Sequence, residues 1–310
     1  MPIETSVSSG STFLMEGALG ERLKREYNLS IDGPVAMASL IYDEKGRGAL
    51  GVLWKEYLTI AERYRLPFLA TTPTRRANKE RVESGGFDES IIADNVQFLH
   101  SIKQTASAEM FIGGLMGCKG DAYTGEETLS FDRAKEFHSW QCDLFKKTSI
   151  DFLYAGIMPV LEEAAGMAAA MAQSGFPYII SFTIQRNGRL IDGNTIDFAI
   201  RYIDGHVSRR PLCYMTNCVH PDIVYRALSH SFNQTETVRS RFIGIQANTS
   251  ALDYADLDGT KELKTTSPVE LANSMARLKS DFNFTIFGGC CGTDNRHMDE
   301  IARQITGKER

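Results

Sequence analysis

The sequence of 310 residues lacks the features of several protein classes. It has no basic excess, because 34 lysines and arginines stand against 39 acidic residues, a net charge of -5. A nucleic-acid-binding surface needs a basic face, so we expect no nucleic-acid partner. No run approaches the ~18 apolar residues of a membrane span, and residues 1–11 lack the charged segment and apolar run of a secretory signal. We therefore expect a cytoplasmic protein that contacts neither nucleic acid nor a membrane.

Cysteine is scarce, and no segment divides the chain. Six cysteines in a reducing compartment are free thiols or metal ligands and not a disulfide framework. No linker rich in glycine, serine or proline is present, and no internal repeat stands out. No GxGxxG motif follows the first predicted strand, which disfavours an open dinucleotide-binding sheet.

Short apolar runs alternate with helix-period segments along the whole chain, which indicates repeated βα units. Eight such units predict an α/β protein, a (β/α)8 TIM barrel, for which about 250 residues are typical. We expect one domain over residues 1–310, with residues 1–10 and 306–310 as flexible ends. The predicted strands are residues 12–16, 67–71, 109–114, 150–155, 178–183, 212–216, 242–247 and 283–287, and clear helical patterns cover 50–64, 89–105, 131–147 and 162–173.

Three cysteines lie where predicted strands end. Asn217-Cys218 comes just after the sixth strand, and Cys290 and Cys291 lie in the segment Gly-Gly-Cys-Cys-Gly-Thr (288–293), just after the eighth. In a TIM barrel both places belong to the C-terminal face, where active sites lie. We therefore expect the three cysteines to meet in space although they are distant in the sequence.

Three converging thiols predict a zinc site with one coordination position open. Zinc prefers thiolates and takes four ligands, and an open fourth position is typical of catalytic sites. A substrate thiol that enters this position would lose its proton and stay nucleophilic, which favours alkyl transfer to sulfur. We therefore interpret Cys218, Cys290 and Cys291 as both metal ligands and catalytic residues. Two alternatives stay open: a structural zinc site closed by His220 or His297, and plain buried thiols.

The residues around the cysteine pair predict a sharp turn followed by a helix. Two adjacent cysteines can face one metal only if the backbone turns sharply, which Gly288, Gly289 and Gly292 would permit. Thr293 and Asp294 are expected to cap a last helix that begins near residue 295.

These motifs resemble the homocysteine S-methyltransferase family, which includes S-methylmethionine-dependent and betaine-dependent enzymes and the homocysteine-binding module of cobalamin-dependent methionine synthase. The segments 217–218 and 288–293 carry the resemblance most specifically. Weaker motifs agree in order: residues 16–20 resemble an Asp-Gly-x-x-Gly start, and residues 72–78 resemble a Thr-Asn-Thr segment that leads into Ala-Asn. Residues 123–125 resemble the loop after strand three, and Asn248 matches an asparagine of strand seven.

The resemblance implies a zinc-dependent methyltransferase of the EC 2.1.1 class. Its methyl group would pass from a sulfonium or ammonium donor to a small-molecule thiol, by default homocysteine, giving methionine. The donor stays open, as does assembly into a homo-oligomer. The substrate-binding residues that the resemblance implies are Glu16, Gly17, Thr72, Thr74, Asn217 and Asn248, beside the metal ligands Cys218, Cys290 and Cys291.

Two positions depart from the family pattern. The family has Glu-Thr at the end of strand four, where the glutamate holds the amino group of homocysteine, but this chain has Gly156-Ile157. It also has Glu16 where the family usually has aspartate. One hypothesis is that Glu16, one methylene longer, reaches into the volume that Gly156 vacates. The alternatives are a methyltransferase for a different thiol or selenol, and a zinc-binding barrel without catalytic activity.

Overall fold

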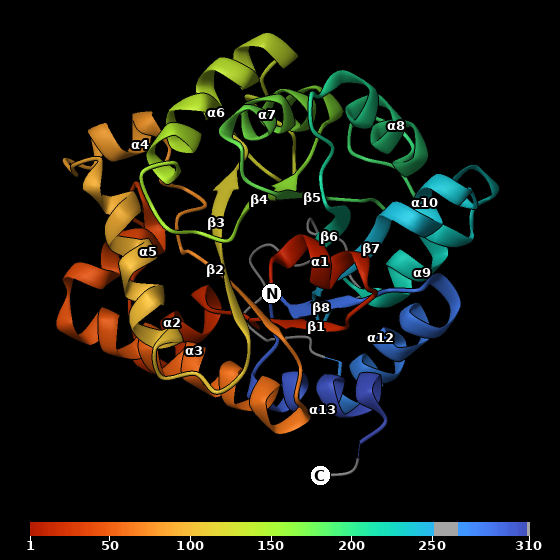
Figure 1. The fold of residues 1–310 in the computed structure, drawn as a ribbon, viewed down its shortest axis with the longest axis horizontal. Coiled ribbons are helices and arrows are strands. Elements are labelled where there is room, and N and C mark those ends of the chain that lie inside the picture. The colour runs from red at the N-terminus through yellow and green to blue at the C-terminus, as the bar shows by residue number, and fades with distance from the viewer. Residues whose placement is uncertain (251–265, 309–310) are drawn as a thin grey trace.

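The computed structural model describes residues 1–250 and 266–308, and over these ranges eight parallel strands close into a barrel (Figure 1). Each strand pairs with the next one in the sequence, and the last returns to the first, with Ile286 opposite Phe13. The predicted TIM barrel is confirmed. The strands are β1 (Phe13–Met15), β2 (Phe68–Thr71), β3 (Met110–Gly117), β4 (Phe152–Met158), β5 (Tyr178–Phe182), β6 (Cys213–Val219), β7 (Phe242–Ala247) and β8 (Ile286–Gly289).

Helices surround the strands and begin where the sequence supplies caps (Figure 1). Asp43, for example, accepts from Gly46 N at 2.7 Å at the start of α3. None of the helices in the described ranges is long and apolar enough to cross a membrane. The helices are α1 (Ile3–Ser8), α2 (Gly20–Tyr27), η1 (Ala36–Tyr42), α3 (Glu44–Tyr64), α4 (Lys79–Ser84), α5 (Ser90–Lys103), α6 (Phe131–Phe145), α7 (Leu161–Ser174), α8 (Ile196–His206), α9 (Pro221–Ser229), η2 (Ser231–Asn233), α10 (Glu236–Arg241), α12 (Pro268–Phe282) and α13 (Asn295–Thr306).

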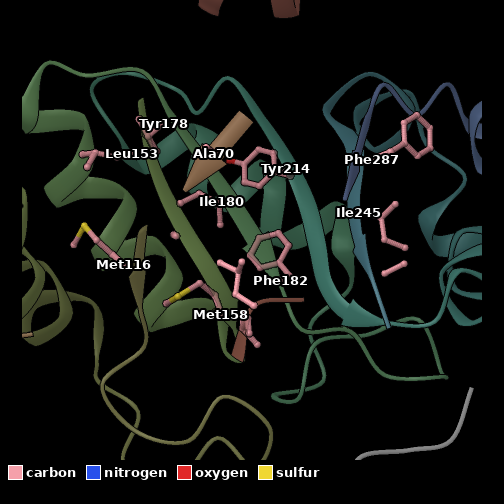
Figure 2. Close-up of a cluster of buried hydrophobic side chains, with 14 of the residues drawn as sticks. Ala70, Met116, Leu153, Met158, Tyr178, Ile180, Phe182, Tyr214, Ile245 and Phe287 are labelled. Atoms are coloured by element: carbon pink, nitrogen blue, oxygen red, sulfur yellow. The ribbon is translucent and has the colours of Figure 1, made fainter. Parts of the chain in front are cut away.

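The strands bury side chains on both faces, as parallel strands in a barrel must. Along β1, Phe13 and Met15 belong to an inner cluster, whereas Leu14 belongs to an outer cluster between strands and helices. Figure 2 shows part of the outer cluster, where Phe182 and Tyr214 of neighbouring strands stack with ring centroids 5.7 Å apart. Two hydrophobic layers thus pack on the two faces of the strands.

One end of the barrel is covered by α1, which lies across it in Figure 1. Ile3 is buried and joins the inner cluster with Phe13 and Phe111. We expected residues 1–10 to be a flexible end; the structure places a helix there, because Ile3 closes the apolar interior. Thr306, expected at the other loose end, is the last residue of α13.

Candidate metal centre

The structure gathers the sulfur atoms of Cys218, Cys290 and Cys291 at the C-terminal end of the barrel. All three lie within 4.8 Å of one another. Cys218 Sγ lies 3.3 Å from Cys291 Sγ, and Cys290 Sγ lies 4.0 Å from Cys291 Sγ. Zinc–sulfur bonds near ~2.3 Å in a tetrahedron place sulfur atoms roughly 3.8 Å apart. The spacing of the three thiols therefore fits one zinc-sized ion.

A bulge near the end of β6 orients Cys218. We predicted Cys218 just after the strand, but it lies inside β6, with a left-handed φ of 57°. The register with β7 shifts between Asn217 and Val219. In a regular strand, Asn217 and Cys218 would face opposite sides, and an irregularity of this kind re-aims a side chain next to a functional site. The sequence pattern of β6 contains no signal for the bulge.

A tight turn after β8 presents Cys290 and Cys291. Cys290 O accepts from both the backbone N (3.1 Å) and the hydroxyl (2.7 Å) of Thr293. Gly292 has φ of 81°, and a Cβ there would lie 1.9 Å from Thr249 Oγ1, so only glycine fits. Asp294 then caps α13, as predicted, by accepting from two backbone amides of its first turn. Thr293 closes the turn and does not cap the helix.

The three thiols form one electrostatic unit. Hydrogen bonds from the thiols of Cys290 and Cys291, and a further one from Tyr123, lower the pKa of Cys218 against the effect of burial. The hydrogen bond with Cys218 in turn raises the pKa of Cys290 and of Cys291. The first ionisation is therefore easy and further ones are costly. A bound divalent cation would supply the charge that lets all three ionise.

The two histidines that could have closed the site are engaged elsewhere. His220 Nε2 lies 3.2 Å from Thr266 Oγ1, and its Nδ1 accepts from Asp222 N at the start of α9. His297 Nε2 lies 3.1 Å from Thr266 O, and its Nδ1 lies 2.7 Å from Asp294 Oδ1. Among the described residues, no histidine, cysteine or carboxylate joins the three cysteines as a fourth member.

A polar network inside the barrel links β4, β6 and β7 beside the cysteines. The Tyr154 hydroxyl lies 3.0 Å from Asn217 Oδ1 and 2.9 Å from Gln246 Oε1. Asn217 Nδ2 donates to Gln246 Oε1, and Ile157 N donates to Asn217 Oδ1 at 3.2 Å. The network holds Asn217, and with it the bulge that carries Cys218, in one orientation. Sequence reasoning found Asn217 but missed Tyr154 and Gln246, which look like ordinary strand residues.

Glu16 lies buried beside β2. Thr71 donates to its carboxyl group through the hydroxyl and through the backbone N, the latter at 3.3 Å. Burial raises the pKa of Glu16 to about 7, although the Thr71 hydrogen bonds lower it. An ammonium group that reached this carboxyl would favour its ionised form. The prediction that Glu16 faces a substrate is therefore chemically reasonable and stays a prediction.

Thr72 and Thr74 hold the loop after β2 against β3. Thr72 Oγ1 accepts from Leu115 N at 3.0 Å, and Thr74 Oγ1 donates to Leu115 O at 2.8 Å. The two hydroxyls lie 2.7 Å apart. Both hydroxyl groups are thus used within the protein. Their contact with a substrate, which the resemblance implies, stays a prediction.

Gly17 and Asn248 shape the loops at the same end of the barrel. A Cβ at Gly17 would lie 2.7 Å from the Tyr57 ring, whose hydroxyl donates to Ala18 O at 2.8 Å. Asn248 Oδ1 accepts from Ser250 N at 2.9 Å just after β7. These observations assign both residues to loop structure and leave their contact with a substrate as a prediction.

The loop between β3 and α6 brings Tyr123 to the cysteines. This loop is held by the buried carboxylate of Glu163 on α7, which accepts from Lys119 N at 2.7 Å and from Leu129 N at 3.3 Å. His138 Nε2 lies 3.1 Å from the same carboxylate. Tyr123 was noted in the sequence only as part of a loop motif, so its contact with Cys218 is a finding of the tertiary structure.

The end of β4 has an apolar neighbour where the family pattern has a glutamate. A Cβ on Gly156 would lie 2.8 Å from Leu115 Cδ1, and Glu16 is not among its three nearest neighbours. Leu115 thus lies beside Gly156 and Thr71 holds Glu16, and the hypothesis that Glu16 takes over the role of the missing glutamate stays a prediction. Ile157 has φ of 58°, and the register with β5 shifts there, so β4 is irregular at the same level as β6.

Comparison with known proteins identifies a sequence family and a similar fold. The sequence model of the homocysteine S-methyltransferase family matches residues 13–305. The fold is similar to that of the homocysteine methyltransferase MmuM from Escherichia coli. The metallated form of that enzyme is 17% identical with a TM-score of 0.75 over 98% of this chain and 100% of that one. The oxidised form is 17% identical with a TM-score of 0.74 over 94% of both chains. No curated protein sequence matches the chain.

Proposed function

The chain belongs to the homocysteine S-methyltransferase family, and on that premise we propose that it is a zinc-dependent enzyme that methylates a thiol. The observation that carries the proposal is the set of three cysteine sulfurs within 4.8 Å of one another, with no fourth ligand among the described residues. Such a donor set leaves a position for a substrate. The default acceptor is homocysteine, which would give methionine.

Zinc bound by the three cysteines would hold the acceptor as its thiolate and so supply a nucleophile near neutral pH. In the transfer, a bond forms between the acceptor sulfur and the methyl carbon. The bond from that carbon to the sulfonium or ammonium centre of the donor breaks, and its electron pair stays with the donor. The thiol proton leaves to solvent. The donor becomes neutral because it keeps the electron pair of the broken bond.

The protein residues around the centre orient the reactants. The network of Tyr154, Asn217 and Gln246 fixes the bulge of β6 and hence the direction of the Cys218 sulfur. Tyr123 donates to Cys218 and stabilises it as a thiolate. Because partners of this kind orient ligands and tune a metal, we assign these residues to positioning and not to bond making.

The experiment that tests the proposal is a matrix of donors and acceptors on zinc-loaded protein. S-methylmethionine, S-adenosylmethionine, betaine and a methylated corrinoid would be crossed with homocysteine and other thiols, with the methylated product measured by mass spectrometry. Cys218→Ser should abolish turnover, whereas Cys142→Ala, at a buried cysteine outside the cluster, should leave it unchanged. If the protein binds zinc but none of the donor and acceptor combinations gives methyl transfer, the non-catalytic alternative is favoured.

A second candidate function is methylation of a thiol other than homocysteine. Leu115 lies beside Gly156 where the family pattern places a glutamate for the amino group. An ammonium group would find no carboxylate at this position, and leaving a charge unpaired in a partly buried site costs on the order of a few kcal/mol.

A further inference from the structure

The turn that carries the two adjacent cysteines starts on the backbone of neighbouring strands. Gly289 N donates to Glu16 O at 3.0 Å, just after β1, and Cys290 N donates to Ala247 O at 2.7 Å, at the end of β7. These bonds belong to the barrel itself and fix the first cysteine. The place of the second, Cys291, depends on the peptide group that follows it.

The peptide group between Cys291 and Gly292 is held at both ends. Its oxygen accepts from Thr249 N at 3.1 Å, and its N–H donates to Glu21 Oε2 at 2.5 Å. In a trans peptide the C=O and the N–H point in opposite directions, so Thr249 and Glu21 hold one plane from opposite sides. The orientation of this plane sets the last backbone dihedral of Cys291. It therefore helps to decide where the Cys291 sulfur lies relative to the other two.

The turn needs such support because it contains Gly292. The φ of 81° at this residue and the contact with Thr249 require glycine. Glycine, however, can adopt many backbone conformations and does not fix the plane by itself. An acceptor for the Gly292 N–H removes part of this freedom, and in the structure that acceptor is a side chain from a helix 271 residues earlier in the sequence.

Glu21 is suited to this task and is not needed to anchor its own helix. It lies in the first turn of α2 and is partly buried. A hydrogen bond from an N–H to a carboxylate is about twice as strong as one between neutral groups. The helix itself is anchored by Leu23, which is fully buried, and by Arg22, which donates to the Tyr57 hydroxyl at 3.1 Å and to Glu56 at 2.8 Å.

The bond to Gly292 is also the whole polar role of the Glu21 side chain in residues 1–250 and 266–308, where it makes no other hydrogen bond or ion pair. A carboxylate with a single partner, placed directly after a metal ligand, points to a function in that ligand's orientation.

We propose that Glu21 is a positioning residue of the metal centre. Its carboxylate holds the peptide between Cys291 and Gly292 and so keeps the Cys291 sulfur where a shared metal can bind it. Glu21 acts through Cys291 and touches neither the metal nor the reactants. Partners that orient metal ligands typically contribute 10-fold to 100-fold to metal affinity. The inference rests on the zinc centre of the proposed function and assigns a further residue to it.

Three substitutions of Glu21 separate its hydrogen bond from its charge. Glu21→Ala removes both, Glu21→Gln keeps an oxygen acceptor without the charge, and Glu21→Asp keeps the charge on a side chain one methylene shorter. Glu44→Ala is the matched control, because Glu44 is an exposed acidic residue in the first turn of α3. Zinc affinity would be measured by chelator competition, the geometry of the site by the visible absorption of cobalt-substituted protein, and Tm on chelator-treated protein.

We expect Glu21→Ala to weaken zinc binding by on the order of tenfold and to change the cobalt absorption, because the Cys291 sulfur is no longer held in place. Glu21→Gln should bind zinc almost as tightly as the wild type and restore the wild-type absorption. Glu21→Asp should bind zinc more weakly than Glu21→Gln, since its carboxylate does not reach Gly292. Glu44→Ala should match the wild type in every measurement.

Wild-type zinc affinity and cobalt absorption in Glu21→Ala would overturn the inference. A lower Tm of that variant with unchanged metal binding would do the same, because the contact would then stabilise only the fold. Tighter zinc binding by Glu21→Asp than by Glu21→Gln would assign the effect to charge and also overturn it.

These measurements do not depend on methyl transfer, so the two proposals can fail separately. If zinc affinity depends on Glu21 but no combination of donor and acceptor gives a methylated product, the proposed function fails and the role of Glu21 stands. If the protein methylates a thiol and Glu21→Ala binds metal like the wild type, the role of Glu21 fails and the function stands. A wild-type protein that binds no zinc would overturn both.

Discussion

The buried carboxyl group of Glu16 should make the stability of the protein depend on pH below neutrality. Burial raises its pKa from 4.5 to about 7. Between these values the folded state binds more protons than the unfolded chain, so the free energy of unfolding falls as pH rises from 4.5 to 7. Since one pKa unit corresponds to about 1.4 kcal/mol, ionised Glu16 costs the native state about 3 kcal/mol. The stabilisation is complete below pH 4.5 and lost above pH 7.

The variant Glu16→Gln removes this titration and keeps an oxygen that can accept from Thr71. At roughly 2.1 cal/mol/K of unfolding entropy per residue, 3 kcal/mol corresponds to a Tm difference of about 5 °C for this chain. The Tm of the variant minus the Tm of the wild type should therefore increase by about 4 °C between pH 5 and pH 8, because part of the change occurs below pH 5. Thermal unfolding followed by circular dichroism on chelator-treated protein measures the difference without a contribution from metal binding.

The control for this measurement is Glu136→Gln, which replaces an exposed carboxylate on α6. Its Tm should follow that of the wild type at every pH. If Glu16→Gln gives a curve parallel to the wild type over the same range, Glu16 is ionised at pH 5 in the folded protein. The interpretation of Glu16 as a buried and partly protonated carboxyl group would then be refuted.

Three further changes test the metal centre and the pocket. Cys290→Ala should lose nearly all bound zinc in metal analysis, because one of three ligands is gone, and unchanged zinc content would exclude this set of ligands. Chelation should abolish methyl transfer while far-ultraviolet circular dichroism stays native, because the barrel has its own large core; global unfolding would show a structural metal. Tyr123→Phe should weaken zinc binding roughly tenfold in chelator competition, as for loss of a partner of a ligand, and equal affinity would exclude the hydrogen bond to Cys218.

Large parts of the fold could be read from the sequence because they depend on local patterns. The apolar runs marked all eight strands, and for β7 the predicted and observed bounds coincide at 242–247. Asp294 was recognised as a cap because capping depends on residues within one turn. The three cysteines could be assigned to one face because every parallel strand of a barrel ends at the same side.

Other features were decided by contacts between strands that are distant in the sequence. The bulge in β6 that orients Cys218 depends on register with β7 and on the network of Tyr154 and Gln246. The sequence pattern contains no such register. In the same way, His220 and His297 were open candidates for a fourth ligand until the fold placed both against Thr266.

The pocket too has features that the sequence revealed and others that only the tertiary structure showed. The sequence revealed that Gly156 replaces a glutamate of the family pattern, but only the structure showed that Leu115 lies beside it and that Glu16 is held by Thr71. Local propensities and spacing determine which residues reach the end of the barrel. Which of them touch one another is decided by register, bulges and side-chain volume, since these are properties of neighbouring strands together and not of any one segment.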